Sequence, residues 1–237
     1  MKHHTALSNP KHHNVEKFYK QSNNAPMDLI KEGHLHLINL EVSSNPFRKG
    51  KESQNAYSGI SATFCHLDWK VHKEDPSSVP MFKDLQQQSS GCRKKSVSVD
   101  LGTAVMEARK YDEKHSGSKI KALAPKGFVF HESRCGSTLV ANSLASFQPD
   151  LNRVYSESGP PITAAKMFDP EYEQESIQLL QDVIYLMGRT NDLNEENLFF
   201  KVQSIGSKSI GVFRKGEYMY CNLPHVPSVQ IVLRSFF

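Results

Sequence analysis

The chain has 237 residues, of which 38% are hydrophobic and 23% are charged, and its formal net charge at pH 7 is +4. This is the composition of an ordinary soluble protein that buries one large core or two modest ones. No apolar run approaches the roughly 20 residues that span a bilayer, and the first residues do not lead into the apolar core of a secretory signal. We therefore expect a cytoplasmic protein with no membrane span.

Basic and acidic residues are unevenly distributed along the chain. Lys and Arg outnumber Asp and Glu in residues 1–126, whereas the reverse holds in residues 127–237. Apart from the cluster Arg93–Lys95, the basic residues of the first part are scattered among acidic ones, and no aromatic residues are interleaved with them to stack on bases. The pattern predicts a solvated surface and no nucleic-acid partner.

The cysteines and histidines could form cross-links or metal sites. Sparse, irregularly spaced cysteines predict reduced thiols and neither a disulfide framework nor a paired-CxxC zinc site. Paired histidines such as His34 and His36 would need further ligands from elsewhere in the chain, so no metal site is predicted. The four cysteines are Cys65, Cys92, Cys135 and Cys221.

The first part of the chain divides into a leader and a small α+β region. Residues 1–33 are polar and rich in Lys, Asn and His, which predicts a flexible leader. Residues 34–118 contain two extended segments that are predicted to pair as antiparallel strands, followed by two helices. The predicted strands are Gly33–Val42 and Ile60–Trp69, and the predicted helices are Met81–Gln88 and Asp100–Lys114.

Strands and helices alternate in residues 119–237. The longest predicted helix has Asp169 as its N-cap, Pro170 at its first position and Gly188 at its end. Alternation predicts an α/β domain with a parallel sheet flanked by helices, where ligands bind beyond the carboxyl ends of the strands. The predicted strands are Gly127–Phe130, Arg153–Ser156, Leu198–Val202 and Val229–Leu233.

The turn after the first of these strands has the pattern of an anion-binding loop. A buried strand, a hydroxyl-rich turn with a glycine and a helix follow one another, which offers free backbone amides to an anion. A nucleotide-hydrolysing P-loop places Lys directly after its last Gly, but here Ser137 follows Gly136 and the cation, Arg134, precedes it. Small residues before a helix also occur in simple packing turns, so that alternative stays open. The loop residues are Arg134, Cys135, Gly136, Ser137 and Thr138.

This turn resembles the 5′-phosphosulfate loop of sulfotransferases, in particular the branch with the pattern Arg-Ser-Gly-Ser/Thr-Ser/Thr, from which only Cys135 departs. The resemblance covers less than half of the chain. It implies a P-loop-type sulfotransferase fold for residues 119–237, with 3′-phosphoadenosine 5′-phosphosulfate as the donor and no metal. The loop amides and Arg134 would neutralise the phosphosulfate bridge, and Ser137 and Thr138 would donate hydrogen bonds to the phosphate.

Three residues near strand ends complete the site that the resemblance implies. Glu157 matches the acidic residue that several sulfotransferase branches use as base, or it could cap a helix that begins at Pro160 or Pro161. Lys201 ends an apolar strand and matches a basic residue that reaches toward the reacting group, or else its side chain extends to water. His131, beside the loop, would be a secondary acid or base, or would hydrogen-bond the turn.

The last predicted strand resembles the strand that leads to the family's 3′-phosphate site. Arg234 matches the arginine at its end, but the family's later serine has no counterpart, because the chain reads Ser235-Phe236-Phe237 and stops. We therefore expect a truncated or divergent terminus, where a protein partner could cover the exposed sheet edge.

Taken together, these features predict sulfuryl transfer to a hydroxyl or amine of a small-molecule or glycan acceptor. Two alternatives stay open. One is a magnesium-dependent P-loop kinase or NTPase, and the other is a non-catalytic, truncated interaction protein. The three differ in the ligand that the loop would bind.

Overall fold

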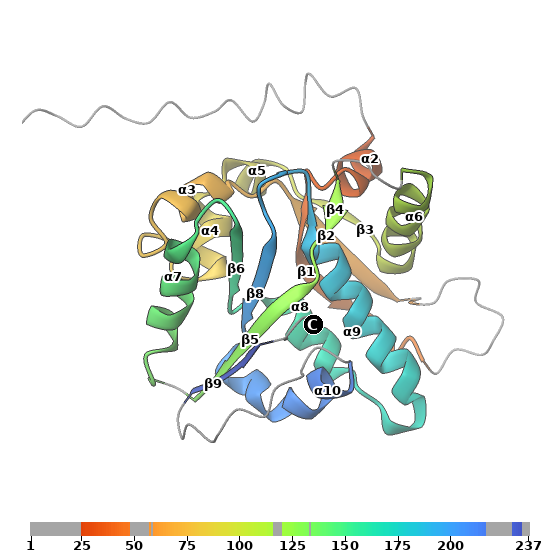
Figure 1. The fold of residues 1–237 in the computed structure, drawn as a ribbon. Helices are drawn as coiled ribbons and strands as arrows, with labels where there is room; N and C mark the ends of the chain where they lie inside the picture. Colours follow the sequence, from red (N-terminus) through yellow and green to blue (C-terminus); the bar gives the residue numbers. More distant parts are fainter. Residues whose placement is uncertain are drawn as a thin grey trace, which may run out of the picture.

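The computed structural model describes residues 25–47, 57, 59–115, 120–132 and 134–216, together with the backbone of residues 229–233. These residues form an α/β protein in which three parallel strands are flanked by helices (Figure 1). The strands are β1 (His36–Val42), β2 (Ile60–Cys65), β3 (Val97–Asp100), β4 (Lys121–Ala122), β5 (Pro125–His131), β6 (Asn152–Ser156), β7 (Arg189–Thr190), β8 (Asn197–Lys201) and β9 (Val229–Leu233). The helices are α2 (Pro26–Lys31), α3 (Trp69–Glu74), α4 (Phe82–Gln88), α5 (Ser90–Lys94), α6 (Leu101–Lys114), α7 (Ser137–Phe147), α8 (Gly159–Lys166), α9 (Glu173–Gly188) and α10 (Ile210–Lys215), with 3-10 turns η1 (Pro170–Tyr172) and η2 (Ser204–Ser209).

The central sheet has the strand order β6-β8-β5-β9. β6, β8 and β5 are parallel, as predicted, but β9 runs antiparallel to β5, so the prediction of an entirely parallel sheet was wrong for this strand. The register shows at which edge β9 starts. η2 stays at the carboxyl edge, where Ser207 Oγ donates to the carbonyl oxygen of His131 at 2.9 Å, and β9 begins opposite His131. A strand that starts at this edge has to run back against β5.

Helices cover both faces of the central sheet. On one face Val154 of β6 packs with Ala141 and Ala145 of α7. Because side chains alternate along a strand, the next residue, Tyr155, points to the opposite face, where its ring stacks on that of Phe200 with 5.2 Å between centroids. This second face belongs to the main core, which α8 and α9 also line.

The N-terminal region forms the antiparallel sheet β1-β2-β3, so the predicted pairing of the first two strands is confirmed. β3 was not predicted. It leads into α6, where the Asp100 carboxylate accepts a hydrogen bond from the Thr103 amide at 2.8 Å and caps the helix. α2, within the predicted leader, buries Leu29 and Ile30. A single hydrophobic cluster contains side chains from this region and from the central sheet.

The longest helix begins later than its sequence pattern predicts. Asp169 does act as a cap, because its carboxylate accepts from the Glu171 amide at 3.0 Å, but the capped segment is the 3-10 turn η1. α9 itself runs from Glu173 to Gly188, so the predicted end at Gly188 is confirmed. The helical boundary therefore moves by three residues while the buried face stays in place.

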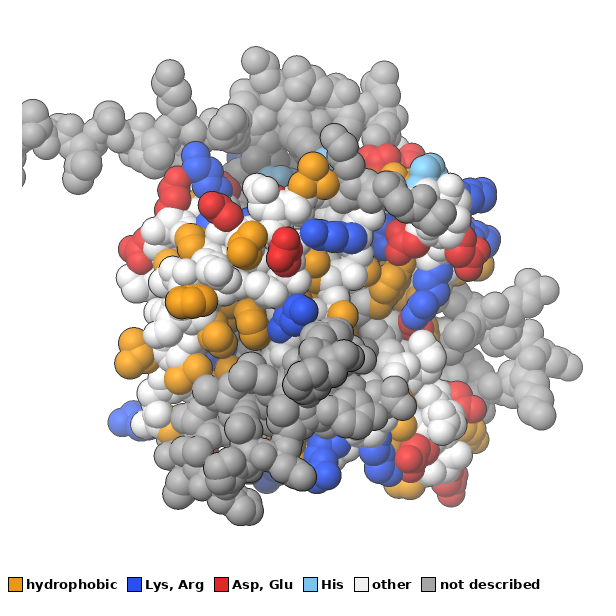
Figure 2. All heavy atoms as spheres, in the orientation of Figure 1, with side chains coloured by type: hydrophobic (Ala, Val, Ile, Leu, Met, Phe, Trp, Pro, Cys, Tyr) orange, Lys and Arg blue, Asp and Glu red, His pale blue; other side chains and the backbone are white. Residues whose placement is uncertain are grey.

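The described surface mixes charges of both signs. Figure 2 shows basic and acidic side chains side by side over the upper part of the visible face. α7 differs from this charged surface because it exposes two large hydrophobic side chains, Leu139 (73% exposed) and Phe147 (79% exposed). Among the helices formed by the described residues, none has both the length and the apolar character that crossing a bilayer requires.

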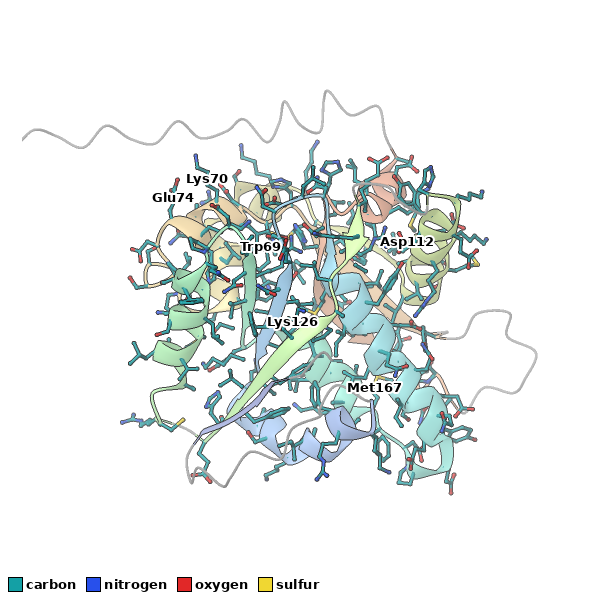
Figure 3. All side chains as sticks on the ribbon, viewed as in Figure 1. Trp69, Lys70, Glu74, Asp112, Lys126 and Met167 are labelled. Carbon is teal, nitrogen blue, oxygen red and sulfur yellow. A yellow bond between two sulfur atoms is a disulfide. The ribbon has the colours of Figure 1, made fainter. Side chains whose placement is uncertain are left out.

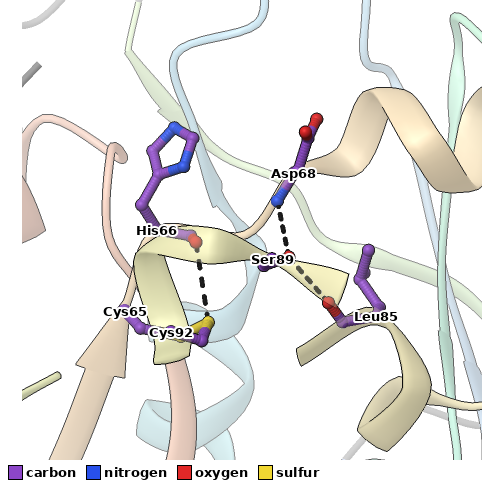
Figure 4. The surroundings of a disulfide bond; sticks show 6 residues. All are labelled: Cys65, His66, Asp68, Leu85, Ser89 and Cys92. Carbon is purple, nitrogen blue, oxygen red and sulfur yellow. Dashed lines mark hydrogen bonds between the residues drawn. A yellow bond between two sulfur atoms is a disulfide. The ribbon is translucent and has the colours of Figure 1, made fainter. Parts of the chain in front are cut away.

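A disulfide joins Cys65, at the end of β2, to Cys92 on α5 (Figure 4), with 4.9 Å between their Cα atoms. The prediction of reduced thiols was therefore wrong for this pair. The two residues are 27 positions apart, and only the packing of α5 against the end of β2 brings them together. Cys135 is a free thiol, and Cys221 lies outside the described residues.

Removing this disulfide should lower the free energy of unfolding by about 2–4 kcal/mol, because the bond limits the conformations of the unfolded chain. The change is the double variant Cys65→Ala/Cys92→Ala, measured by urea unfolding, and Cys135→Ala serves as the control for loss of a thiol. Equal stability of the double variant and the wild type, or a peptide map without the cross-linked peptide, would contradict this expectation.

Candidate functional site

The three parallel strands place their last residues at one edge of the central sheet. β5 ends at His131, β6 at Ser156 and β8 at Lys201, and Ser156 lies opposite Lys201 in the register. Glu157 follows β6 directly. Carboxyl ends of parallel strands form the ligand-binding edge of such sheets, so the predicted residues of three separate segments meet here.

The loop from β5 to α7 is shaped by backbone conformations that side chains rarely adopt. Gly136, at the N-cap of α7, has φ +82°, which glycine tolerates without steric cost. Arg134 has φ +62° and is exposed. Ser137 is buried, whereas Cys135 and Thr138 are half-buried. No side chain of the described residues caps α7. The Leu139 amide donates to the Gly136 carbonyl oxygen at 2.9 Å, so the amides of Ser137 and Thr138 are the ones that keep their capacity to bind an anion.

A buried ion pair lies beside this helix end. The ammonium of Lys201, whose side chain is 1% exposed, contacts the carboxylate of Glu157, whose side chain is 29% exposed. Lys201 Nζ also donates to Thr138 Oγ1 over 3.4 Å. An unpaired ammonium would be costly to bury, so Glu157 is what allows the lysine to stay inside. Lys201 therefore does not extend to water.

The backbone of Glu157 is held in an unusual conformation. Its φ is +61°, its amide donates to the Lys201 carbonyl oxygen at 2.7 Å, and its own carbonyl oxygen accepts from Gln203 Nε2 at 3.1 Å. Glu157 does not cap the following helix, because α8 begins at Gly159 with Ser158 at its N-cap. The two backbone hydrogen bonds fix the direction of the carboxylate instead.

His131 connects the loop to the ion pair. Its Nδ1 lies 2.8 Å from the Glu132 carbonyl oxygen and therefore donates to it, which leaves Nε2 as the second ring nitrogen facing the site. Nε2 is buried, lies 3.6 Å from the Glu157 carboxylate and makes no hydrogen bond to any residue that the structure describes. His131 thus bonds the turn and also reaches the ion pair. Arg234 and Ser133 lie outside the described residues.

Met81 is a neighbour of the site that sequence reasoning missed. Its Sδ lies 3.6 Å from Ser156 Oγ and 3.9 Å from Lys201 Nζ, and its amide is fixed by Asp84 Oδ2 at 3.1 Å. Met81 precedes α4 in the N-terminal region. No motif could have revealed it, because a contact across 120 residues depends on how that region packs on the central sheet.

The predicted histidine pair lies at the opposite, amino edge of the sheet. His34, His36 and His66 line a cavity of about 230 Å³, here called the histidine cavity, together with Arg153 of β6 and Trp69 of α3, which Figure 3 labels. Burial is the main cause that lowers the pKa of each imidazole, and that of His36 falls well below its ordinary value. Within the described part of the chain, no group of three or more His, Cys, Asp or Glu side chains is arranged to hold a metal ion.

Comparison with protein-family models, with curated proteins and with solved structures finds no match for this chain. The function therefore has to be inferred from the residues at the carboxyl edge themselves. What they offer is a helix N-terminus, a buried ammonium, a half-exposed carboxylate and a buried imidazole within a few ångströms of one another. This is a setting for an anionic ligand and for transfer of a proton.

Proposed function

We propose that this chain is a P-loop-type, sulfotransferase-like protein that transfers a sulfuryl group from 3′-phosphoadenosine 5′-phosphosulfate to a hydroxyl or amine of a small-molecule or glycan acceptor. One observation carries the proposal: Thr138, Glu157 and Lys201, from three separate segments, converge beside the start of α7. The resemblance of the loop to a phosphosulfate loop implies a basic residue and a carboxylate near this place.

The donor would be held by groups that complement its negative charge. The first-turn amides of α7, the Ser137 and Thr138 hydroxyls and the Arg134 guanidinium would surround the 5′-phosphosulfate. Lys201 would stabilise the charge that develops on the bridging oxygen as the bond to sulfur breaks. Arg234 keeps its proposed role at the 3′-phosphate. None of these roles requires a metal ion.

The acceptor would react in line with the departing phosphate. Its oxygen or nitrogen forms a bond to sulfur, the bond between sulfur and the bridging oxygen breaks, and 3′-phosphoadenosine 5′-phosphate leaves with the electron pair. Glu157 would take the acceptor proton, since its carboxylate is fixed by the backbone and is partly accessible. His131 would support that carboxylate from 3.6 Å.

The disulfide bears on the compartment in which the protein works. Cytosolic thiols are kept reduced, whereas a pair such as Cys65 and Cys92 persists under oxidising conditions. This favours an oxidising compartment over the cytoplasm that the sequence predicts. We also propose that a protein partner pairs with β9, which is an outer strand of the central sheet.

Calorimetric titration with 3′-phosphoadenosine 5′-phosphate tests the proposal directly. Saturable binding that is unchanged by EDTA supports a sulfotransferase. Binding of ATP or GTP only with magnesium would support the kinase or NTPase alternative. Absence of any binding to the folded protein would leave the non-catalytic interpretation.

Replacing Lys201 with Met should weaken binding of 3′-phosphoadenosine 5′-phosphate by about 10- to 100-fold, the usual value of a hydrogen bond to a charged group. Met keeps the length of the side chain and suits a buried position, and the Glu157 carboxylate that loses its partner is 29% exposed and can be hydrated, so the fold should survive. Lys110→Met, which removes an exposed lysine of α6, is the matched control and should bind like the wild type. Equal affinities of both variants would contradict the role of Lys201.

A further inference from the structure

The buried ammonium of Lys201 is poorly satisfied by the groups around it. An ammonium has three hydrogen atoms to donate. One is directed to the Glu157 carboxylate. Among the described residues, its other polar neighbours are Thr138 Oγ1 at 3.4 Å, a long contact, and Met81 Sδ at 3.9 Å, a weak acceptor. An anion that binds at the start of α7 would therefore be a better hydrogen-bond acceptor for Lys201 than either Thr138 or Met81.

The same carboxylate that stabilises Lys201 also neutralises it. An anion that binds at the start of α7 has to share the ammonium with Glu157, which contacts it already. Like charges repel strongly where water is largely excluded, and Lys201 is 1% exposed. Simultaneous close contact of the anion and Glu157 with one ammonium is thus unfavourable.

We infer that Glu157 is an internal counter-anion that the donor displaces from Lys201. This inference rests on the proposed function. In the free protein the carboxylate holds the ammonium, and when the phosphosulfate takes over Lys201, the carboxylate is left with His131 as its polar neighbour and becomes available to the acceptor proton. Donor binding would thereby prepare the base, and the donor would have to bind before the acceptor reacts. No covalent bond changes in this exchange.

The exchange makes an unusual prediction: removing the negative charge of a proposed catalytic residue should strengthen donor-site binding. Glu157→Gln keeps the shape of the side chain, and we expect about tenfold tighter binding of 3′-phosphoadenosine 5′-phosphate, measured by calorimetry. Glu132→Gln is the matched control, because it removes an exposed carboxylate of the adjacent loop without touching Lys201, and its effect should stay below about threefold. In a Lys201→Met background the gain from Glu157→Gln should be clearly smaller, because no ammonium is left to compete for and only the direct repulsion between carboxylate and anion is relieved. If the Gln variant does not fold, Glu157→Asn replaces it, since Asn tolerates a positive φ.

The outcomes separate this inference from the proposed function. If the wild type binds 3′-phosphoadenosine 5′-phosphate but Glu157→Gln binds no tighter, or if the gain is just as large without Lys201, the exchange is wrong and the proposed function stands. If only inorganic pyrophosphate binds and Glu157→Gln tightens it, the exchange holds for another anion and the sulfotransferase proposal falls. If neither probe binds the folded wild type, both are overturned.

Discussion

Replacement of Glu195 with Ala is expected to lower the free energy of unfolding by about 3–5 kcal/mol, because it leaves a buried charge without its partner. Glu195 is 1% exposed, and its carboxylate contacts Arg153, which is 2% exposed, and Lys73 at 3.0 Å. It also accepts from Thr190 Oγ1 at 2.7 Å. Lys73 keeps Asp192 as a second partner, so the main loss falls on the Arg153 guanidinium.

Urea unfolding of Glu195→Ala and of Glu196→Ala measures this effect with a neighbouring carboxylate as the control. Glu196 is exposed, so its replacement should change the free energy of unfolding by no more than about 0.5 kcal/mol. Adding Arg153→Met to Glu195→Ala should recover part of the stability, because the uncompensated charge is then gone. A Glu195→Ala variant as stable as the control would show that the pair is not important for the fold.

Acidification from pH 7 to pH 4 is expected to lower the free energy of unfolding by about 3 kcal/mol through His72 alone. Burial, and secondarily the charge of Lys73, lower the pKa of His72 from its ordinary value of 6.5 to about 4. Above pH 6.5 the imidazole is neutral in both states and contributes nothing. Below it the unfolded chain takes up a proton that the folded protein does not, so stability is lost progressively until the pH reaches about 4.

His36 acts in the same direction, since burial and the nearby Arg153 lower its pKa as well. The measurement is the free energy of unfolding as a function of pH for the wild type and for His72→Leu, which cannot take up the proton. The variant should lose less stability between pH 7 and pH 4. Identical pH profiles for the two proteins would rule out His72 as a source of the acid sensitivity.

Local patterns were sufficient for those parts of the fold and site that depend on single strands. Glu157 directly follows one strand and Lys201 ends another, and the ends of neighbouring parallel strands must meet. The direction of β9 and the pairing of the cysteines were harder to predict. The orientation of β9 depends on the edge of the sheet at which the strand starts, and the Cys65–Cys92 bond depends on where α5 packs.

The other residues of the site could not be predicted because they come from distant packing. Met81 contacts Lys201 only because the N-terminal region packs on the central sheet. Gln203 and Ser207 hold Glu157 and His131 through main-chain carbonyl oxygens, which carry no sequence signal. Sequence therefore indicates the charged groups of such a site better than the groups that orient them.

The positive φ angles of Arg134 and Glu157 have opposite consequences for selection of a more stable protein. Each conformation is one that only glycine adopts freely, and holding another residue there costs of the order of 1–3 kcal/mol. Random libraries screened for survival at high temperature would be drawn to glycine at position 134, where the guanidinium is exposed, but not at position 157, where glycine would leave the buried Lys201 ammonium without its partner. Selection for stability alone would therefore remove the loop cation of the proposed donor site and keep the buried ion pair.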